Sequence, residues 1–316
     1  MRRTSLLRGF PFLVALVSVL CPVALATSDI DQRLRDEYRD KMLVLRGFYS
    51  GSSLHFDVSG NPFGKTIPGD WTVDGIVLID DVKISGDRVR VRASRVHLGW
   101  DDGVTRALHD YVGKNPDKDE KRERALQMEA DLSPGEVTVE AVDAALSRIF
   151  LTSQDSLADL VPSYWKFCLR PGSASESGTA PEVERLAGSC RFSPEFQAVP
   201  GLALHSDAPR DSDSDVKPSE GIFHVGRGIS APRVLQHSDP AFSDSARKAK
   251  FQGVVTLSLT VDATGTPQNV RIVKPLGCGL DAQAVHTVEA WRFKPAEKDG
   301  QPVAASIAVE VDFHLY

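Results

Sequence analysis

Several signatures of enzymes and metalloproteins are missing from this sequence of 316 residues. It has no Gly-x-Ser-x-Gly elbow and no glycine-rich loop of the kind that cradles phosphate, and no paired-carboxylate motif stands out. The histidines His55, His97 and His109 lack metal-ligand spacing and have no cysteines beside them. We therefore expect no catalytic centre, no metal site and no cofactor, and predict that the protein is not an enzyme.

An excess of positive charge is also missing. The formal net charge is −6, which argues against nucleic acid as a partner. The hydrophobic content is 41%, an ordinary value for a globular protein, and the length leaves room for about two domains.

Long apolar runs are absent except at the start. Residues 1–26 combine an arginine-containing beginning with an uncharged run that ends in Ala24-Leu-Ala26, a small-x-small cleavage pattern. This predicts a signal peptide, export to the periplasm or cell envelope, and Thr27 as the first mature residue. The alternative is an uncleaved inner-membrane anchor, although the run is slightly shorter than the ~20 residues of a spanning helix.

The chain is most regular near its end. Residues 254–261 alternate apolar and polar side chains, Asp262-Ala-Thr-Gly265 supplies turn chemistry, and residues 268–274 form a second short strand. This pattern predicts an antiparallel hairpin. Around it we expect helices at 240–249 and 280–291 and a last alternating strand at 305–313. The order helix, strand, strand, helix, strand predicts one antiparallel sheet with helices on one face, an α+β fold.

These residues carry a family resemblance. It rests on an ordered set of short motifs: Asp239-Pro-Ala-Phe, Gln252-Gly-Val, Asp262-x-x-Gly265, Gly279-Leu-Asp281, Trp291-Arg-Phe-Lys-Pro295 and Asp299-Gly300. Residues 229–316 therefore resemble the C-terminal domain of TonB-family proteins. Trp291 and Phe293 are expected to be core residues of this domain.

The resemblance implies a partner. TonB-family domains bind a short segment of an outer-membrane transporter by strand pairing, so the edge of the last strand is the candidate docking site. We assign that edge to Ser306, Ala308, Val309, Glu310 and Val311. The same edge can instead pair with a second copy in a homodimer or be covered. The family's transducers use a membrane histidine that the apolar run lacks, which argues against coupling to inner-membrane proton-channel partners.

The N-terminal half shows no family resemblance. We expect a helix at 30–41, strands at 42–49, 54–57 and 71–79, and a hairpin made by 82–85 and 88–98. Residues 27–112 are then a β-rich module, a small barrel or a curled sheet. Arg88, Arg90, Arg92 and Arg95 form either a basic binding face or a solvated face screened by Asp80, Asp81 and Asp87.

The next two segments are less regular. Residues 113–204 are predicted to be helical or irregular, with helices at 139–150 and 157–161. Residues 205–228 are acidic and are predicted to be a flexible linker. Cys168 and Cys190 bracket a serine-, glycine- and proline-rich insertion, and we predict a disulfide between them. Cys278 is left as a small, partly exposed residue.

The sequence thus predicts an exported, non-enzymatic adaptor that supports transport across the outer membrane through its C-terminal domain. The alternative function is a cell-envelope scaffold or interaction protein with a partner unrelated to transport.

Overall fold

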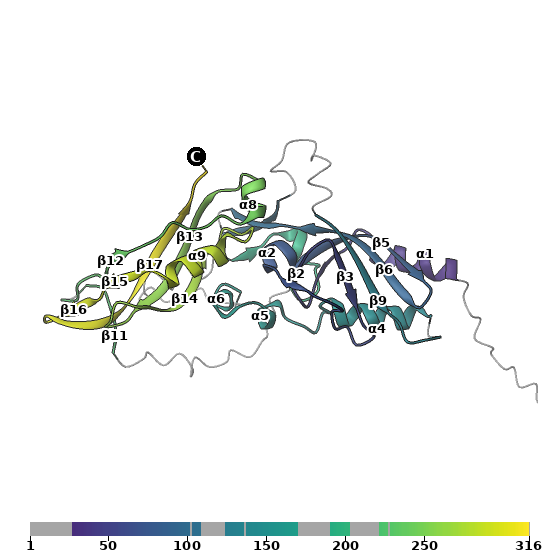
Figure 1. Ribbon diagram of the computed structural model, residues 1–316, viewed down its shortest axis with the longest axis horizontal. Helices are drawn as coiled ribbons and strands as arrows, with labels where there is room; N and C mark the ends of the chain where they lie inside the picture. The colour runs from purple at the N-terminus through teal and green to yellow at the C-terminus, as the bar shows by residue number, and fades with distance from the viewer. Residues whose placement is uncertain are drawn as a thin grey trace, which may run out of the picture.

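The computed structural model describes residues 27–101, 103–108, 124–135, 137–169, 190–202, 221–226 and 228–315. The predicted signal segment, the serine-rich insertion at 171–181 and residues 205–220 of the predicted linker lie outside these ranges. Two sheets lie end to end along the long axis, with the N-terminal half at the blue end and the C-terminal half at the yellow end (Figure 1). No helix among the described residues is long and apolar enough to cross a membrane.

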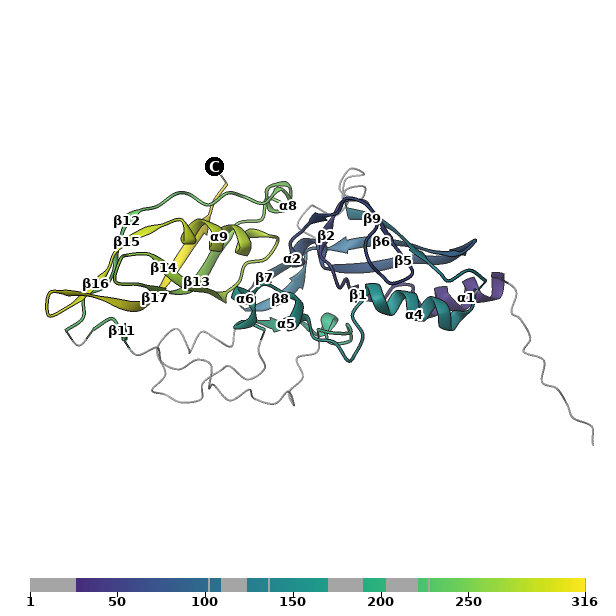
Figure 2. The same ribbon diagram turned by 60° about the horizontal axis from the view of Figure 1, so that its bottom comes forward.

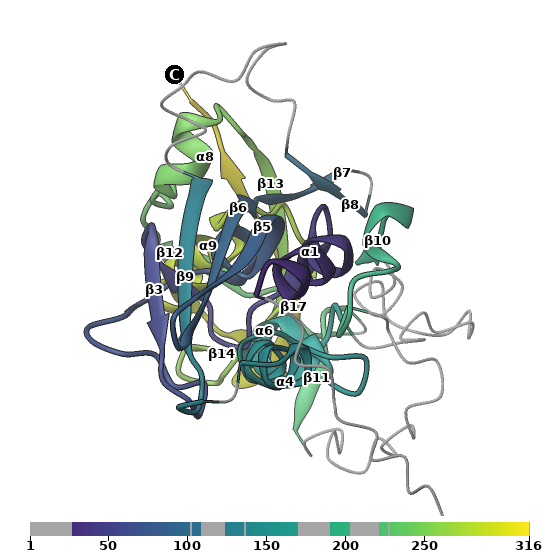
Figure 3. The same cartoon turned by 90° about the vertical axis from the view of Figure 1, so that its right-hand side faces the viewer.

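The N-terminal sheet is open and mixed. Its strands lie in the order β1 (Met42–Val44), β5 (Ile76–Ser85), β6 (Arg88–Val96), β9 (Ala125–Asp131) and β3 (Ser53–Phe56). Neighbours are antiparallel except β3 and β9, which run parallel. Helices α1 (Thr27–Tyr38) and α4 (Val139–Ile149) lie on one side of this sheet (Figure 2). The end-on view places α1 against β5 and β6 (Figure 3). The order ends at β1 and β3, so this part is a sheet with two edges and not a closed barrel.

Alternation along the strands explains the core of this half. Val77 and Ile79 of β5, with Val89 and Val91 of β6, are buried under Leu34 of α1 and Leu146 of α4. Residues of the helices therefore close the face that these strands leave apolar.

Three expectations for this half are wrong. Residues 71–74 form a short helix, α2 (Trp71–Asp74), and not the start of a strand, because the Asp70 carboxylate caps it by accepting from Thr72 N at 2.8 Å. Residues 45–48 belong to no strand, since β1 stops at Val44 and β2 (Tyr49–Ser50) pairs separately with β4 (Ile67–Pro68). Strand β9 lies in a range expected to be helical or irregular, although its alternating Leu126, Met128 and Ala130 are all buried.

The arginines of β6 divide between two environments. Arg88 and Arg90 contact Glu129, at 3.4 Å and 2.8 Å, Arg88 also contacts Asp131 at 2.9 Å, and Arg92 contacts Asp81 at 3.2 Å. These three side chains form a solvated charge ladder, whose acids come mainly from β9. Arg95 is not part of the row, because its side chain is only 4% exposed and is paired with Asp74 at 2.9 Å.

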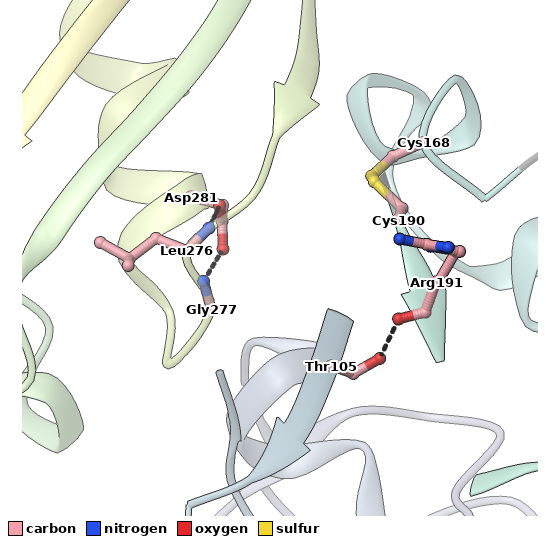
Figure 4. Close-up of a disulfide and its surroundings, with 7 residues drawn as sticks. All are labelled: Thr105, Cys168, Cys190, Arg191, Leu276, Gly277 and Asp281. Carbon is pink, nitrogen blue, oxygen red and sulfur yellow. Dashed lines mark hydrogen bonds between the residues drawn. A yellow bond between two sulfur atoms is a disulfide. The ribbon is translucent and has the colours of Figure 1, made fainter. Parts of the chain in front are cut away.

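A middle layer joins the two halves. It consists of β7 (Leu98–Asp101), β8 (Val104–Ala107), β10 (Arg191–Phe192), α5 (Leu157–Leu160), α6 (Ser163–Lys166) and a 3-10 helix, η1 (Pro194–Phe196). Cys168 and Cys190 form a disulfide with a Cα separation of 5.3 Å, the pairing that the sequence predicts (Figure 4). The Thr105 hydroxyl donates to the Arg191 carbonyl at 2.7 Å, next to the disulfide. The disulfide thus attaches β10 to the segment that carries α6.

Both halves share one hydrophobic core. Trp71, Trp100 and Trp165 meet in the middle layer with ring centroids 4.9 to 5.9 Å apart, and their cluster continues into the C-terminal sheet. Backbone bonds cross the same junction: Trp100 N donates to Leu276 O at 2.9 Å, and Cys278 N donates to Leu98 O at 2.7 Å. Cys278 is therefore fully buried, which corrects the expectation of partial exposure. The C-terminal half is docked on the N-terminal half by side chains and by backbone.

The C-terminal half has the expected order of helix, strand, strand, helix, strand. These elements are α8 (Asp244–Lys248), β13 (Gly253–Val261), β14 (Pro267–Lys274), α9 (Leu280–Glu289) and β17 (Gln301–Phe313). Shorter strands accompany them: β11 (Ile222–His224), β12 (Arg233–Gln236), β15 (Arg292–Lys294) and β16 (Ala296–Lys298). The sheet order is β11-β17-β13-β14, and α9 packs against β13 and β14.

Candidate functional site

The turn of the hairpin is built by one carboxylate. Asp262 accepts from Thr264 N at 2.9 Å, from Thr266 N at 3.0 Å and from the Thr264 hydroxyl, and these bonds lower its pKa. Gly265 has a φ of +86°, and a Cβ there would lie 1.9 Å from the Phe293 carbonyl oxygen. Glycine is needed at this position both for the backbone conformation and for the close approach of β15. The turn thereby fixes which residues of β13 and β14 lie opposite each other in the sheet.

Strand β17 is held along one side by β13. The antiparallel register runs without a break from Ala305 opposite Val261 to Phe313 opposite Gly253. Ala305, Val311 and Phe313 are buried, while Ala308, Glu310 and Asp312 on the opposite face are exposed. This period of two buries one face of the strand in the core and exposes the other. The pairing with β13 uses only one of the two backbone sides of the strand.

The chain itself covers part of that other side. Strand β11 runs parallel to β17 and pairs Ile222, Phe223 and His224 with residues 304, 305 and 306. Strand β16 pairs with the start of β17, at 301–303. Within the ranges that the structure describes, residues 307–313 pair with no strand on the side away from β13. An open edge therefore remains, which we call the free edge, and it begins after Ser306.

The structure thus separates the five residues assigned to the docking edge. Ser306 lies between His224 of β11 and Thr260 of β13, so its backbone is in the interior of the sheet. Ala308, Val309, Glu310 and Val311 lie on the free edge, with Ala308 and Glu310 exposed, Val309 half-buried and Val311 buried. The covered alternative that the sequence left open therefore holds for residues 304–306, and the assignment of Ser306 to the docking edge is wrong.

The sequence does not predict strand β11, because these residues fall in the predicted acidic linker. Its signal is short, namely the apolar pair Ile222-Phe223 directly after the polar stretch. The ammonium of Lys298 lies 4.7 Å from the centroid of the Phe223 ring, which ties β11 to the β16–β17 hairpin. The predicted flexible linker therefore ends in an ordered strand, in the yellow-green half of the molecule (Figure 1).

The helix beside the sheet starts at a buried carboxylate. Asp281 of α9 accepts from Leu276 N at 2.8 Å and from Gly277 N at 2.7 Å (Figure 4). The side chain is fully buried, and burial raises its pKa to about 7, while the two backbone bonds act in the opposite direction. Asp281 therefore shapes the 276–278 loop that bonds to β7, besides lying at the positive end of the helix dipole.

The aromatic residues of the family motif serve the core. Phe293 is buried, as expected. Trp291 is half-buried, and its indole N–H donates to Ser238 O at 3.2 Å. In the part of the chain that the structure describes, no group of three or more His, Cys, Asp or Glu side chains is arranged to hold a metal ion. The chemistry available at the free edge is therefore main-chain pairing.

Comparison with known proteins gives matches to the C-terminal part of the chain. The family model described as Gram-negative bacterial TonB protein C-terminal matches residues 238–315. Protein TonB of Vibrio cholerae serotype O1 is 31% identical over 99 residues, covering 31% of this chain and 41% of the relative. Protein tonB2 of Pseudomonas aeruginosa is 30% identical over 82 residues, covering 26% of this chain and 30% of the relative.

Two further matches cover similar parts. Protein TonB of Xanthomonas campestris pv. campestris is 34% identical over 77 residues, covering 24% of this chain and 34% of the relative. The solution structure of the Pseudomonas aeruginosa TonB CTD shares 18% identity, with a TM-score of 0.25, and covers 30% of this chain and 94% of that chain. This chain spans less than half the length of the curated relatives it matches.

Proposed function

Residues 238–315 belong to the TonB C-terminal family, and from this premise we propose that the protein is a cell-envelope adaptor for transport across the outer membrane. In this function a segment of an outer-membrane transporter adds as a strand to the free edge of β17. The adaptor transmits force or position and carries out no reaction of its own. The observation that carries the proposal is the open backbone of residues 307–313 at the border of an otherwise paired sheet.

The free edge favours a partner strand of defined character. Exposed carboxylates at Glu310 and Asp312 alternate with Val309 and Val311, whose side chains turn toward the core. Opposite charges on facing residues of neighbouring strands stabilise a pair by about 0.2–1 kcal/mol. The partner segment that fits best is therefore extended and carries Lys or Arg at alternate positions facing 310 and 312.

The first test removes one outward backbone donor. Successive residues of a strand direct their N–H groups to opposite sides, so only one of Ala308→Pro and Val309→Pro removes a donor that faces the partner. The other breaks a bond to β13 and should lower the thermal unfolding midpoint. We expect the variant with the nearly unchanged midpoint to lose at least about tenfold of its affinity for a transporter, because it lacks a main-chain bond and places a ring at the interface.

Capture from detergent-solubilised outer membranes by the immobilised full chain, read by mass spectrometry, measures this. The matched control is Val225→Pro, an exposed position outside the free edge. Recovery of no transporter by the unchanged protein contradicts the proposal. Equal capture by the two proline variants also contradicts it, since the free edge would then play no part.

A second prediction concerns strand β11. An incoming strand can pair with residues 304–306 only after β11 has separated from β17. The larger the fraction of molecules in which β11 stays paired, the lower is the apparent affinity for such a partner. Phe223→Gly removes the contact with Lys298 and weakens the strand, so we expect capture of the transporter to rise roughly threefold. Val225→Gly is the control with the same substitution outside β11. Unchanged capture by Phe223→Gly indicates that the partner needs only 307–313.

One observation favours the second candidate function, a cell-envelope scaffold unrelated to transport. The C-terminal half shares its core with the N-terminal half and bonds to β7 through 276–278. Such docking suits a rigid scaffold that presents the free edge at a fixed place. The same capture experiment distinguishes the two functions by the class of protein that is recovered and lost again in the proline variant.

A further inference from the structure

A cavity of about 480 Å³ lies in the N-terminal half, away from the free edge. It is enclosed by the end of α1, strand β1, helix α4 and the segment after η1. A volume of this size is in the range of small-molecule sites. None of its lining residues lies in the C-terminal sheet that carries the free edge.

The floor of the cavity is apolar and the rim is charged. Leu43, Leu146, Phe150, Leu151 and Val199 line it and are all buried. Asp40, Lys41, Glu195 and Ala198 line it and are exposed. A bound molecule therefore places an apolar body against the floor and a polar group at the rim.

The hydroxyl donors of the lining are already used by the protein. The Tyr38 hydroxyl donates to Asp143 Oδ1 at 2.7 Å, Ser147 Oγ donates to Ala144 O at 2.9 Å, and Thr152 Oγ1 donates to Asp155 Oδ2 at 2.6 Å. Burial and the neighbouring Asp143 raise the pKa of Tyr38, so this hydroxyl keeps its proton and its bond at neutral pH.

What remains for a ligand is an excess of acceptors. The lining carries three carboxylates, Asp40, Asp143 and Glu195, against one cation, Lys41, while Arg39 lies beside the lining with its Nε 3.9 Å from Asp40 Oδ2. A carboxylate has several lone-pair sites, so the single bond from Tyr38 leaves Asp143 with acceptor capacity. Glu195 accepts from Ala107 N at 3.1 Å through Oε1, which leaves Oε2 for a ligand.

We propose that this cavity binds an amphiphilic cation, with its ammonium group at the carboxylate-bearing rim and an apolar body on the floor. An anionic amphiphile of the same shape meets repulsion at the rim, and a neutral one lacks the positive charge that the carboxylates attract. The site lies on other elements than the free edge, so its occupation is independent of the proposed transport function.

Isothermal titration of the full chain with three ten-carbon probes tests the proposal, each below its micellar concentration. The probes are decylammonium, decan-1-ol and decanoate. We expect the cation to bind about tenfold more tightly than the alcohol, a difference of about 1.4 kcal/mol, and the anion to bind more weakly still. Equal affinity for the cation and the anion overturns the proposal.

Variants locate the binding. Asp143→Asn and Glu195→Gln should each weaken the cation roughly threefold and leave the alcohol unchanged, because an exposed ion pair is worth up to about 1 kcal/mol. Asp159→Asn, an exposed position on α5 outside the lining, is the control with the same change of charge. Ala198→Trp, at the exposed rim, should block both probes. Unchanged cation affinity in Asp143→Asn and Glu195→Gln, or in a folded Ala198→Trp, shows that the probe binds elsewhere and overturns the proposal.

Discussion

Replacing Arg95 by alanine is expected to lower the free energy of unfolding by about 4 kcal/mol, because it leaves a buried carboxylate without a counter-charge. Arg95 bonds to the Asp74 carboxylate at 2.9 Å and donates to the carbonyls of Asp74, Tyr49 and Gly51 at 3.0, 2.7 and 2.7 Å. One side chain thus provides hydrogen-bond donors for the last carbonyl of α2 and for two carbonyls at strand β2, those of Tyr49 and Gly51. Urea denaturation followed by tryptophan fluorescence measures the loss.

Arg90→Ala is the matched control, since Arg90 lies in the same strand and its side chain is 47% exposed beside Glu129. An exposed pair of this kind contributes at most about 1 kcal/mol. Arg95→Met separates charge from packing, because methionine keeps much of the apolar stem. We expect Arg95→Met to be nearly as unstable as Arg95→Ala, and expect Arg95→Met with Asp74→Asn to recover part of the loss. Equal stability of Arg95→Ala and Arg90→Ala contradicts the account.

Arg95 also shows where the sequence is informative and where it is not. Strand alternation places Arg88, Arg90 and Arg92 on one face and Arg95 on the other. The pattern alone therefore could have predicted that Arg95 is buried. Its partners were not, because Asp74, Tyr49 and Gly51 come from segments that only the tertiary fold brings together.

The C-terminal hairpin was predictable because its information is local. Alternation on both sides of Asp262-x-x-Gly265, and turn bonds between residues at most four apart, fix it without help from the rest of the chain. Helix α2 is the opposite case: Trp71-Thr-Val-Asp74 has strand-like residues, and the cap from Asp70 and the burial of Trp71 decide in favour of a helix.

The candidate site was predictable in part for the same reason. The alternation of 305–313 identified β17, and the family resemblance predicted that its edge is the docking surface, which stays a prediction. The sequence did not predict strand β11, because its three residues adopt a strand conformation only by pairing with β17, about eighty residues later in the chain. The junction of β7 with 276–278 is likewise a long-range contact between two glycine-containing segments that carry no pattern of their own.

The second large effect is a dependence of stability on pH that originates at Asp281. Its pKa is raised from 3.8 to about 7, first by burial and then by the nearby Asp70, so the folded protein holds a proton that the unfolded chain has already released. The unfolded state binds fewer protons between these values, and stability must therefore fall as the pH rises from about 4 to about 7. The full shift corresponds to a loss of up to about 4 kcal/mol, after which the curve is level.

Asp281→Asn should remove most of this fall, because the amide cannot ionise. Asp281 accepts from Leu276 N through Oδ1 and from Gly277 N through Oδ2, so the single amide oxygen keeps only one of these bonds and we expect the variant to be less stable at every pH. Asp159→Asn, at an exposed position on α5, is the control. The carboxyls of Asp131, Asp155 and Asp262 have lowered pKa values in the folded protein, so they stabilise it once they are ionised. This stabilisation is lost as the pH falls below the pKa values of the unfolded chain, which is the opposite pH dependence and lies at lower pH. Unfolding curves between pH 5 and 8 therefore lie above the range in which these three carboxylates act, and the comparison with Asp281→Asn separates Asp281 from Asp70 and Asp74, whose pKa values are also raised by burial.

The effect of Asp281 should be felt at the junction of the two halves, because its two acceptor bonds shape the loop whose backbone bonds to β7. Hydrogen exchange of the Trp100 and Cys278 amides reports on that junction directly. We expect both amides to exchange faster, after correction for intrinsic rates, at pH 8 than at pH 5.5 in the unchanged protein and at similar corrected rates in Asp281→Asn. A pH dependence that persists in Asp281→Asn would assign the proton to another group, with buried Asp70 the next to replace.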